Sequence, residues 1–369
     1  MYAVKTKWII VFIVAALMLN TIMFFTLTVN GYSYLYSAGV FLSTKKITAG
    51  DGVYDEYTYF KKSAKWNKIF ILEPEHPADI FESKGNVGLA VDFLSFLNSG
   101  YDINYILEDI SYAAGALINL YINGGSEELL DEVFGLDGAG TLIPMRKYYY
   151  KALREYNMHL PENKRLVLWG LDVESDKSRF SERYLDYLLG LVSNKVKPAA
   201  VAAVLSASRD DRYKYFDDIR LSLEKNELLY KELFVEEFFN FSMLVNNYFT
   251  SDYDERQTVQ SKALSLVKIY QKNKKGKYYG VFSSAMFINA AHSLETEIGE
   301  RTAVVNLINE QWFPEKGELL YSVNNKGLSR FVGYRNFIYG LYGIDKVERY
   351  NGLGDVFFLL NAGAKTNEG

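Results

Sequence analysis

The sequence predicts an α/β fold in which helices flank a mainly parallel sheet, with a helical insertion, behind an N-terminal transmembrane helix. Two observations support the sheet and its insertion. Short apolar runs alternate along the chain with segments whose apolar residues have helical spacing, an order typical of parallel sheets. One long segment, residues 176–272, is almost wholly helical in pattern and rich in charge. We expect it to be an insertion that packs over the sheet.

Length and composition describe a globular protein and exclude several classes of function. The chain has 369 residues, 49% of them hydrophobic and 23% charged, enough for one large domain or two ordinary ones. A net charge of −4 leaves no basic excess for holding nucleic acid. Because cysteine is absent, disulfides, zinc–thiolate sites, a cysteine nucleophile and a lipid-modified cysteine are excluded. The 30 tyrosines and 24 phenylalanines are interpreted as core packing and amphipathic surface, rather than a stacking site for bases or sugars.

The N-terminal segment predicts a membrane anchor. An apolar run covers residues 8–29, and at ~1.5 Å per residue such a helix can cross a ~30 Å hydrocarbon core. Lys5 and Lys7 favour a cytoplasmic N-terminus. We therefore expect residues 1–35 to be an anchor, and residues 36–369 to form one domain outside the cytoplasm, periplasmic or extracellular. A cleaved signal peptide and a buried core helix are the alternatives.

The remaining elements follow from apolar spacing and from turn residues. Ser111 is a predicted N-cap, and Asn123, Gly124 and Gly125 close the helix that it begins. Strands are predicted at residues 67–73, 103–107, 165–169, 278–288 and 356–360. Helices are predicted at residues 84–99, 111–122, 126–134 and 143–157.

The first strand ends in an unusual way. Its apolar residues, 69–72, are followed at once by Glu73, Pro74, Glu75 and His76. Burying charge is costly unless the charge is paired or used, and Pro74 blocks further pairing within the sheet. Ligands of open α/β sheets bind just beyond the carboxyl ends of the strands. The chemistry of the protein is therefore predicted to begin at this strand end.

Other predicted strands also end in polar groups. Glu108 and Asp109 follow the second strand, Asp172 follows the third, and His292 comes just after the fourth. Since the strands are predicted to be parallel, these groups should share one edge of the sheet and face one cleft. Histidine with carboxylates suits general acid–base catalysis, and the same set suits a divalent metal. His159, the third histidine of the chain, precedes a strand and is interpreted as structural.

Familiar nucleophile and phosphate motifs are absent. The sequence has no Gly-x-Ser-x-Gly elbow and no His-Glu-x-x-His pair. The glycines between Gly135 and Gly140 lack the preceding strand and the following lysine of a phosphate loop, and are interpreted as a turn. Water is therefore the expected nucleophile of a hydrolytic reaction. No organic cofactor is expected, and a divalent metal stays an open possibility.

The order of these segments resembles the erythromycin esterase family, most clearly over residues 68–175 and again near His292. That family has a strand followed by Gly-Glu-x-x-His, a second strand ending in Leu-Glu before a serine-containing helix, and a later strand followed by Gly-x-Asp. The segments that match are Leu72 to His76, Leu107 to Ser111, Asn119 to Gly124, Arg154 to Asn157, Gly170 to Asp172, and Ala291 with His292.

The resemblance implies an α/β hydrolase that activates water for attack on an ester carbonyl. His76 would be the general base, with Glu73 and Glu108 orienting it or the water, and His292 would assist on the carbonyl side. The remaining strand-end acids, Glu75, Asp109 and Asp172, are assigned to substrate binding.

The resulting hypothesis is a membrane-anchored hydrolase that cleaves an ester or related acyl bond in a small-molecule or envelope substrate. One alternative is a metal-dependent hydrolase on the same scaffold, since two histidines and several carboxylates stand without a conventional nucleophile. Another is a catalytically inactive envelope protein that binds a partner through residues 176–272. The departures from the family pattern at Leu72 and Pro77, and the single late histidine, favour that second alternative.

Overall fold

The chain divides into two units, one formed by Ser63–Ala303 and one formed by Met1–Lys62 together with Val304–Gly369. A computed structural model describes the following residues: 14, 15, 18, 44–46, 65–74, 79–81, 84–135, 143–175, 180–207, 211, 214–249, 255–283, 285–309, 330–334 and 356–360.

The larger unit contains the parallel sheet that the sequence predicts. Its strands are β2 (Ile69–Pro74), β7 (Tyr278–Val281), β3 (Tyr105–Ser111) and β4 (Val167–Asp172), in that spatial order. Each pair is parallel, with Leu72 beside Val281 and Leu107 beside Gly280. The first four residues of β2 are no more than 1% exposed, as expected of a strand covered on both faces.

Helices cover both faces of this sheet and fill the segment between β4 and β7. The elements before β4 are η2 (Asp79–Phe81), α4 (Lys84–Tyr101), α5 (Tyr112–Ile122), α6 (Glu127–Gly135), α7 (Ile143–His159) and η3 (Glu162–Lys164). Those between β4 and β7 are β5 (Glu174–Ser175), α8 (Phe180–Leu191), α9 (Ala199–Ser206), α10 (Phe216–Lys225), α11 (Glu227–Phe234), η5 (Val235–Glu237), α12 (Phe238–Asn247), β6 (Tyr248–Phe249) and α13 (Glu255–Lys272). After β7 come α14 (Ala285–Leu294) and α15 (Thr296–Glu300).

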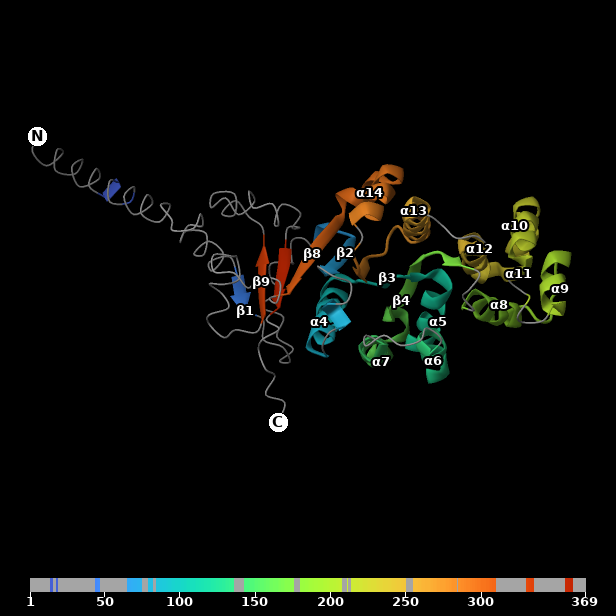
Figure 1. Cartoon of the computed structure of the whole chain (residues 1–369), viewed down its shortest axis with the longest axis horizontal. Helices are drawn as coiled ribbons and strands as arrows, with labels where there is room; N and C mark the ends of the chain where they lie inside the picture. Colours follow the sequence, from blue (N-terminus) through green and yellow to red (C-terminus); the bar gives the residue numbers. More distant parts are fainter. Residues whose placement is uncertain are drawn as a thin grey trace, which may run out of the picture. The chain divides into compact units, whose positions relative to one another are not determined.

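Adjacent tyrosines of β7 show which helices cover which face. The Tyr279 hydroxyl donates to the Ala90 carbonyl of α4 (3.0 Å), whereas the Tyr278 hydroxyl donates to the Ile269 carbonyl of α13 (3.3 Å). Successive side chains of a strand point to opposite faces. Helix α4 therefore covers one face and α13 the other, and Figure 1 shows α4 and α7 on one side of the strands with α13 and α14 on the other.

Helix α5 approaches β4 so closely that both elements need glycine at the contact. A Cβ atom on Gly115 would lie 2.7 Å from the Gly170 Cα, and a Cβ on Gly170 would lie 2.8 Å from the Ser111 carbonyl carbon. Both neighbours are backbone atoms and cannot rotate away. The N-cap predicted for α5 is confirmed, because the Ser111 hydroxyl accepts from the Ala114 amide (3.2 Å).

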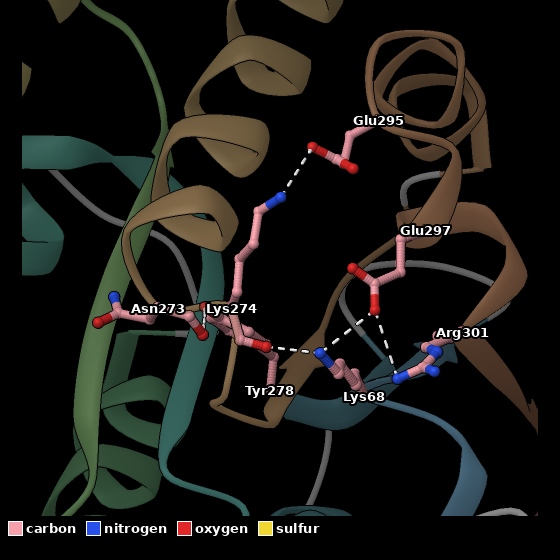
Figure 2. A network of polar contacts seen from close by, with 7 residues as sticks. All are labelled: Lys68, Asn273, Lys274, Tyr278, Glu295, Glu297 and Arg301. Atoms are coloured by element: carbon pink, nitrogen blue, oxygen red, sulfur yellow. Dashed lines mark hydrogen bonds and ion pairs between the residues drawn. The ribbon is translucent and has the colours of Figure 1, made fainter.

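The amino ends of the strands are held by a network of charges (Figure 2). Lys68, just before β2, pairs with Glu297 (3.3 Å) and donates to the Lys274 carbonyl (2.5 Å). Arg301 pairs with Glu297 (3.3 Å), and Lys274 with Glu295 (3.8 Å). The Arg301 carbonyl also accepts from the Lys68 amide (2.8 Å). This network joins the start of β2 to α15 and to the turn before β7.

Several predicted boundaries are wrong. The strand predicted at residues 278–288 ends at Val281, and residues 285–294 are helix α14. In that helix Phe287, Ile288 and Ala291 are buried, at the spacing of one helical face. Helix α4 runs through Gly100 to Tyr101 and ends where Asp102 adopts a φ of 58°, a left-handed conformation that aspartate tolerates better than most residues.

The smaller unit contains strands in the order β1 (Thr44–Lys46), β9 (Arg330–Tyr334), β10 (Val356–Leu360) and β8 (Thr302–Asn309), the last of which belongs to this unit from Val304 onward. Strand β10 lies where the sequence predicts it. It pairs in parallel with β8 and antiparallel with β9, and β9 pairs antiparallel with β1. The sequence pattern did not predict β1, β8 or β9.

The predicted membrane anchor, residues 8–29, lies outside the described residues except at positions 14, 15 and 18. Within the part of the chain that the structure describes, no helix combines the length and the apolar character needed to cross a bilayer.

The contact between α5 and β4 yields a stability prediction. Replacing Gly115 by alanine should lower the free energy of unfolding by about 1–3 kcal/mol, because the added methyl group meets backbone. The matched control is Gly190 in α8, where an added Cβ meets nothing within 4 Å. Gly190→Ala should raise stability by about 0.5–1 kcal/mol, since alanine is the better helix former. Urea unfolding of both variants measures the difference, and equal effects would contradict the close contact.

Candidate functional site

The carboxyl ends of the parallel strands carry the acids that the sequence singles out. Glu73 lies near the end of β2, Glu108 and Asp109 lie in the last half of β3, and Asp172 is the last residue of β4. Because the strands are parallel, these acids share one edge of the sheet. Glu75 and His76, which come directly after β2, lie beyond the described part of the chain.

The acids do not face a single cleft, so that expectation is wrong. Glu108 and Asp109 are neighbours in β3 and point to opposite faces of the sheet. Glu108 accepts a hydrogen bond from Tyr149 of α7, whereas Asp109 pairs with Lys262 of α13. Glu73, Glu108, Asp109 and Asp172 lie on the predicted edge of the sheet, but the alternation of side chains along β3 divides them between its two faces.

Glu108 is buried, with only 4% of its surface exposed. The Tyr149 hydroxyl donates to its Oε1 atom (3.2 Å). Burial raises the pKa of Glu108 to about 8, against the smaller opposing effects of the Tyr149 hydrogen bond and the Arg146 charge. Burial, together with Glu108, also raises the pKa of Tyr149 well above its ordinary value. At neutral pH this pair is therefore a protonated carboxyl and a neutral phenol.

Asp109 and Asp172 share one lysine on the opposite face. Lys262 lies 2.7 Å from Asp109 and 3.3 Å from Asp172. Burial alone would lower the pKa of Lys262, but the hydrogen bond and charge of Asp109, with the charge of Asp172, raise it. Burial raises the pKa of Asp172, opposed chiefly by the charge of Lys262. Two of the three acids assigned to substrate binding, Asp109 and Asp172, are thus engaged by a cation of the chain itself.

The sequence did not lead us to predict a role for Lys262, although the spacing of apolar residues in its helix contains a signal for one. Leu266, Ile269 and Tyr270 of α13 are fully buried, and they follow Lys262 at intervals of four, seven and eight residues. That spacing places the lysine on the apolar face of its helix. A charge on such a face needs partners, which here are the two strand-end aspartates.

Glu73 is half-buried at the end of β2. It accepts a hydrogen bond from the Ser283 hydroxyl (3.3 Å), and Ser283 comes directly after the neighbouring strand β7. Glu73 therefore lies next to the end of β7. In the chain it comes three positions before His76.

His292 does not follow a strand, and that prediction is wrong. It lies in the last turn of α14, where its Nδ1 atom is 2.9 Å from the Thr296 carbonyl and its ring packs against Gly299. Gly299 is two residues before Arg301, whose carbonyl binds the start of β2. His292 therefore lies toward the amino edge of the sheet, whereas Glu73 lies roughly 13 Å along β2 from its first residue. His159, at the end of α7, bonds the Glu155 carbonyl (2.6 Å).

Among the described residues, no group of three or more His, Asp or Glu side chains is arranged to hold a metal ion.

The sequence matches no protein-family model and no curated protein. The fold, however, is found in solved structures. A protein from Bacillus cereus has a TM-score of 0.57 at 10% identity, and a succinoglycan biosynthesis protein has 0.54 at 11%; each match covers 88% of this chain and 96% of that chain. An erythromycin esterase mutant in its open conformation has 0.50 at 13%, covering 83% of this chain and 93% of that one. The chain therefore shares its fold with these proteins.

The buried carboxyl of Glu108 yields a prediction for stability against pH. Its folded-state pKa of about 8 lies above the ordinary value of 4.5, so the stabilisation is complete below about pH 4.5 and is lost as pH rises toward about 8. Relative to Glu108→Gln, the wild-type free energy of unfolding should fall by about 1.4 kcal/mol per pH unit in this window.

Urea unfolding of both proteins between pH 5 and about 8 makes the comparison. Glu236→Gln, at an exposed acid, serves as control and should run parallel to the wild type. Parallel profiles for Glu108→Gln as well would contradict the raised pKa.

Proposed function

We propose that the protein is a membrane-anchored hydrolase that uses water to cleave an ester or related acyl bond at the carboxyl edge of the parallel sheet. The observation that supports this most strongly is Glu108, a carboxyl in the carboxyl-terminal half of the central strand β3 whose pKa burial raises to about 8. Perturbed acids of this kind are concentrated at functional sites, and the position is where ligands of such sheets bind.

The proposed reaction divides its work among three residues. His76 takes the proton from the water that attacks the acyl carbon, and Glu73 holds the imidazole or the water in place. The acyl C–O bond breaks, and the proton returns from His76 to the departing alkoxide. Glu108 enters this scheme in its protonated form, because its proton can be donated in a hydrogen bond while Tyr149 occupies its Oε1 atom. Glu108 is thus a positioning donor in this proposal rather than a second base.

His292 has no part in the proposed reaction, since its helix carries it toward the amino edge of the sheet. Asp109 and Asp172 orient the site only through Lys262, with which both pair. Glu75 is proposed to contact the substrate, as the remaining acid next to His76 in sequence.

The substrate is proposed to be an ester of the cell envelope or a small molecule that reaches it. The apolar run at residues 8–29 would anchor the chain, with its main part outside the cytoplasm. Two fold neighbours are consistent with this choice: one is an erythromycin esterase and another takes part in succinoglycan biosynthesis. The first is consistent with an ester bond as the target, and the second with a succinoglycan-like molecule that carries this bond.

One observation favours a second candidate, a binding protein without activity. Lys262 already neutralises Asp109 and Asp172, so two of the strand-end acids are less available to a substrate.

A metal-dependent hydrolase, in which His76 and strand-end carboxylates hold a divalent ion, differs from the leading proposal in its sensitivity to chelator.

Activity of the full chain on a panel of esters and lactones tests the proposal. His76→Ala should lower kcat/KM by about 10²–10⁴, the usual contribution of a general base. Glu108→Gln keeps a neutral hydrogen-bond donor and should retain activity to within roughly tenfold, whereas Glu108→Leu, which has no donor, should lose more. Glu236→Gln is the control.

Four outcomes separate the candidates. Turnover that survives chelator and is lost in His76→Ala supports the proposal. Turnover lost in chelator as well would favour the metal enzyme. Turnover unaffected by His76→Ala would contradict the assignment of the base, and no turnover on any ester would favour the binding protein.

A further inference from the structure

A pocket of about 100 Å³ lies beside β4, on the side of the strand away from β3. Helix α5, strand β4, helix α8 and the η5–α12 segment form its walls. The residues that define this β4 pocket are Tyr112, Trp169, Tyr184, Tyr187, Glu237 and Asn240. None of the strand-end acids lines it, so it is a different site from the one proposed for hydrolysis.

Aromatic rings make up much of the pocket wall. Tyr112 stacks on Trp169 with ring centroids 6.2 Å apart, and Tyr184 stacks on Tyr187 at 5.9 Å. Tyr112 and Tyr184 meet edge to face at 6.5 Å, which joins the two pairs. Tyr187 is 40% exposed, whereas Tyr112 and Tyr184 are buried. The four rings are therefore in continuous contact, with Tyr187 at the solvent-exposed side.

The indole nitrogen of Trp169 is buried without a partner. The residue is 9% exposed, and its Nε1 atom has no hydrogen-bond acceptor among the described residues. Buried polar groups in native proteins nearly always have a partner. Trp169 lines the pocket, so a ligand oxygen that reaches Nε1 would give this donor the acceptor that it lacks.

A chain of hydrogen bonds supplies the complementary groups. The Tyr112 hydroxyl donates to Asn240 Oδ1 (3.0 Å), and Asn240 Nδ2 donates to Glu237 Oε2 (2.5 Å). Glu237 thereby presents a carboxylate, held by Asn240, to the same pocket. A carboxylate accepts hydrogen bonds from ligand hydroxyls, while the indole N–H donates to a ligand oxygen.

The charges around the pocket favour a neutral ligand over a cation. Lys272 lies 4.1 Å from the centroid of Phe239 and 5.9 Å from that of Trp169. The charge of Glu237 acts on Lys272, opposing the lowering of its pKa by burial. Glu237 thus already has a cation nearby, and a second one would be repelled by it. Aromatic faces with a carboxylate and a neutral donor suit a ring that carries hydroxyls on its rim and C–H groups on its face.

We propose that the β4 pocket binds a neutral sugar ring of the pyranose class, which stacks on the tyrosines and bonds to Trp169 Nε1 and Glu237. This site does not depend on the proposed hydrolysis, and it gives part of the aromatic content a role in recognition. It would hold a saccharide portion of a ligand at the edge of the sheet.

Isothermal titration of the full chain with the methyl glycosides of glucose, galactose and mannose tests the proposal. At least one should bind, and Tyr187→Ala should weaken that binding by about tenfold through the loss of one stacking face. Tyr148→Ala is the matched control, because Tyr148 has a similar exposure (39% against 40%) but does not line the pocket.

Trp169→Phe keeps an aromatic ring but removes the N–H donor together with part of the ring surface, so it should weaken binding several-fold. Tyr187 lies partly in solvent, and its variant keeps the test valid if Trp169→Phe does not fold, as circular dichroism will show. Binding of no glycoside, binding unchanged in Tyr187→Ala, or tighter binding of tetramethylammonium than of any glycoside would overturn the proposal.

Discussion

The proposed chemistry depends on one costly feature, the burial of a carboxyl group in the carboxyl-terminal half of β3. An ionised carboxylate at that depth would lose its hydration, and the Tyr149 hydrogen bond and the Arg146 charge do not offset that loss, so the group keeps its proton instead. Glu108 is 4% exposed and has the Tyr149 phenol as a hydrogen-bond donor. A parallel strand covered by helices on both faces makes this possible, because side chains on both of its faces are kept away from water.

Because side chains alternate along β3, two adjacent residues of this strand lie in different electrostatic environments. Glu108 meets phenols and becomes neutral, whereas Asp109 meets Lys262 and forms an ion pair. The same lysine reaches Asp172 on β4. At the strand ends, one face of the sheet thus carries a protonated acid and the other face carries an ion pair. The two faces can therefore serve different purposes, with the proton donor on the α7 side and a structural link to α13 on the other.

The sequence predicted the parts of this arrangement that follow from periodicity. Apolar runs marked the cores of β2, β3 and β4, and Ser111 marked the start of α5. His292 was misplaced because a run of apolar residues after Tyr278 fits a strand as well as a helix, and only packing decides between them. The pairing of Lys262 with Asp109 joins residues far apart in the chain, so no local pattern contains it.

The aromatic content shows a second limit of sequence reading. Most described tyrosines are core residues, such as Tyr149, Tyr270 and Tyr279, which agrees with the interpretation as packing. The tyrosines of the β4 pocket come from α5 and α8, and their convergence around Trp169 is a tertiary property. The motifs that resemble the erythromycin esterase family predicted a fold that the solved structures share, whereas the geometry around His76 lies outside the described residues.

The protonation state of Glu108 at neutral pH is the central claim, and infrared difference spectroscopy measures it most directly. The spectrum of the wild type minus that of Glu108→Gln isolates the carboxyl band of this one side chain. The account predicts the C=O stretch of a protonated acid at pH 7, replaced by the carboxylate bands as pH rises past about 8. Carboxylate bands already present at pH 6 would contradict it, because Glu108 would then be ionised in the folded protein.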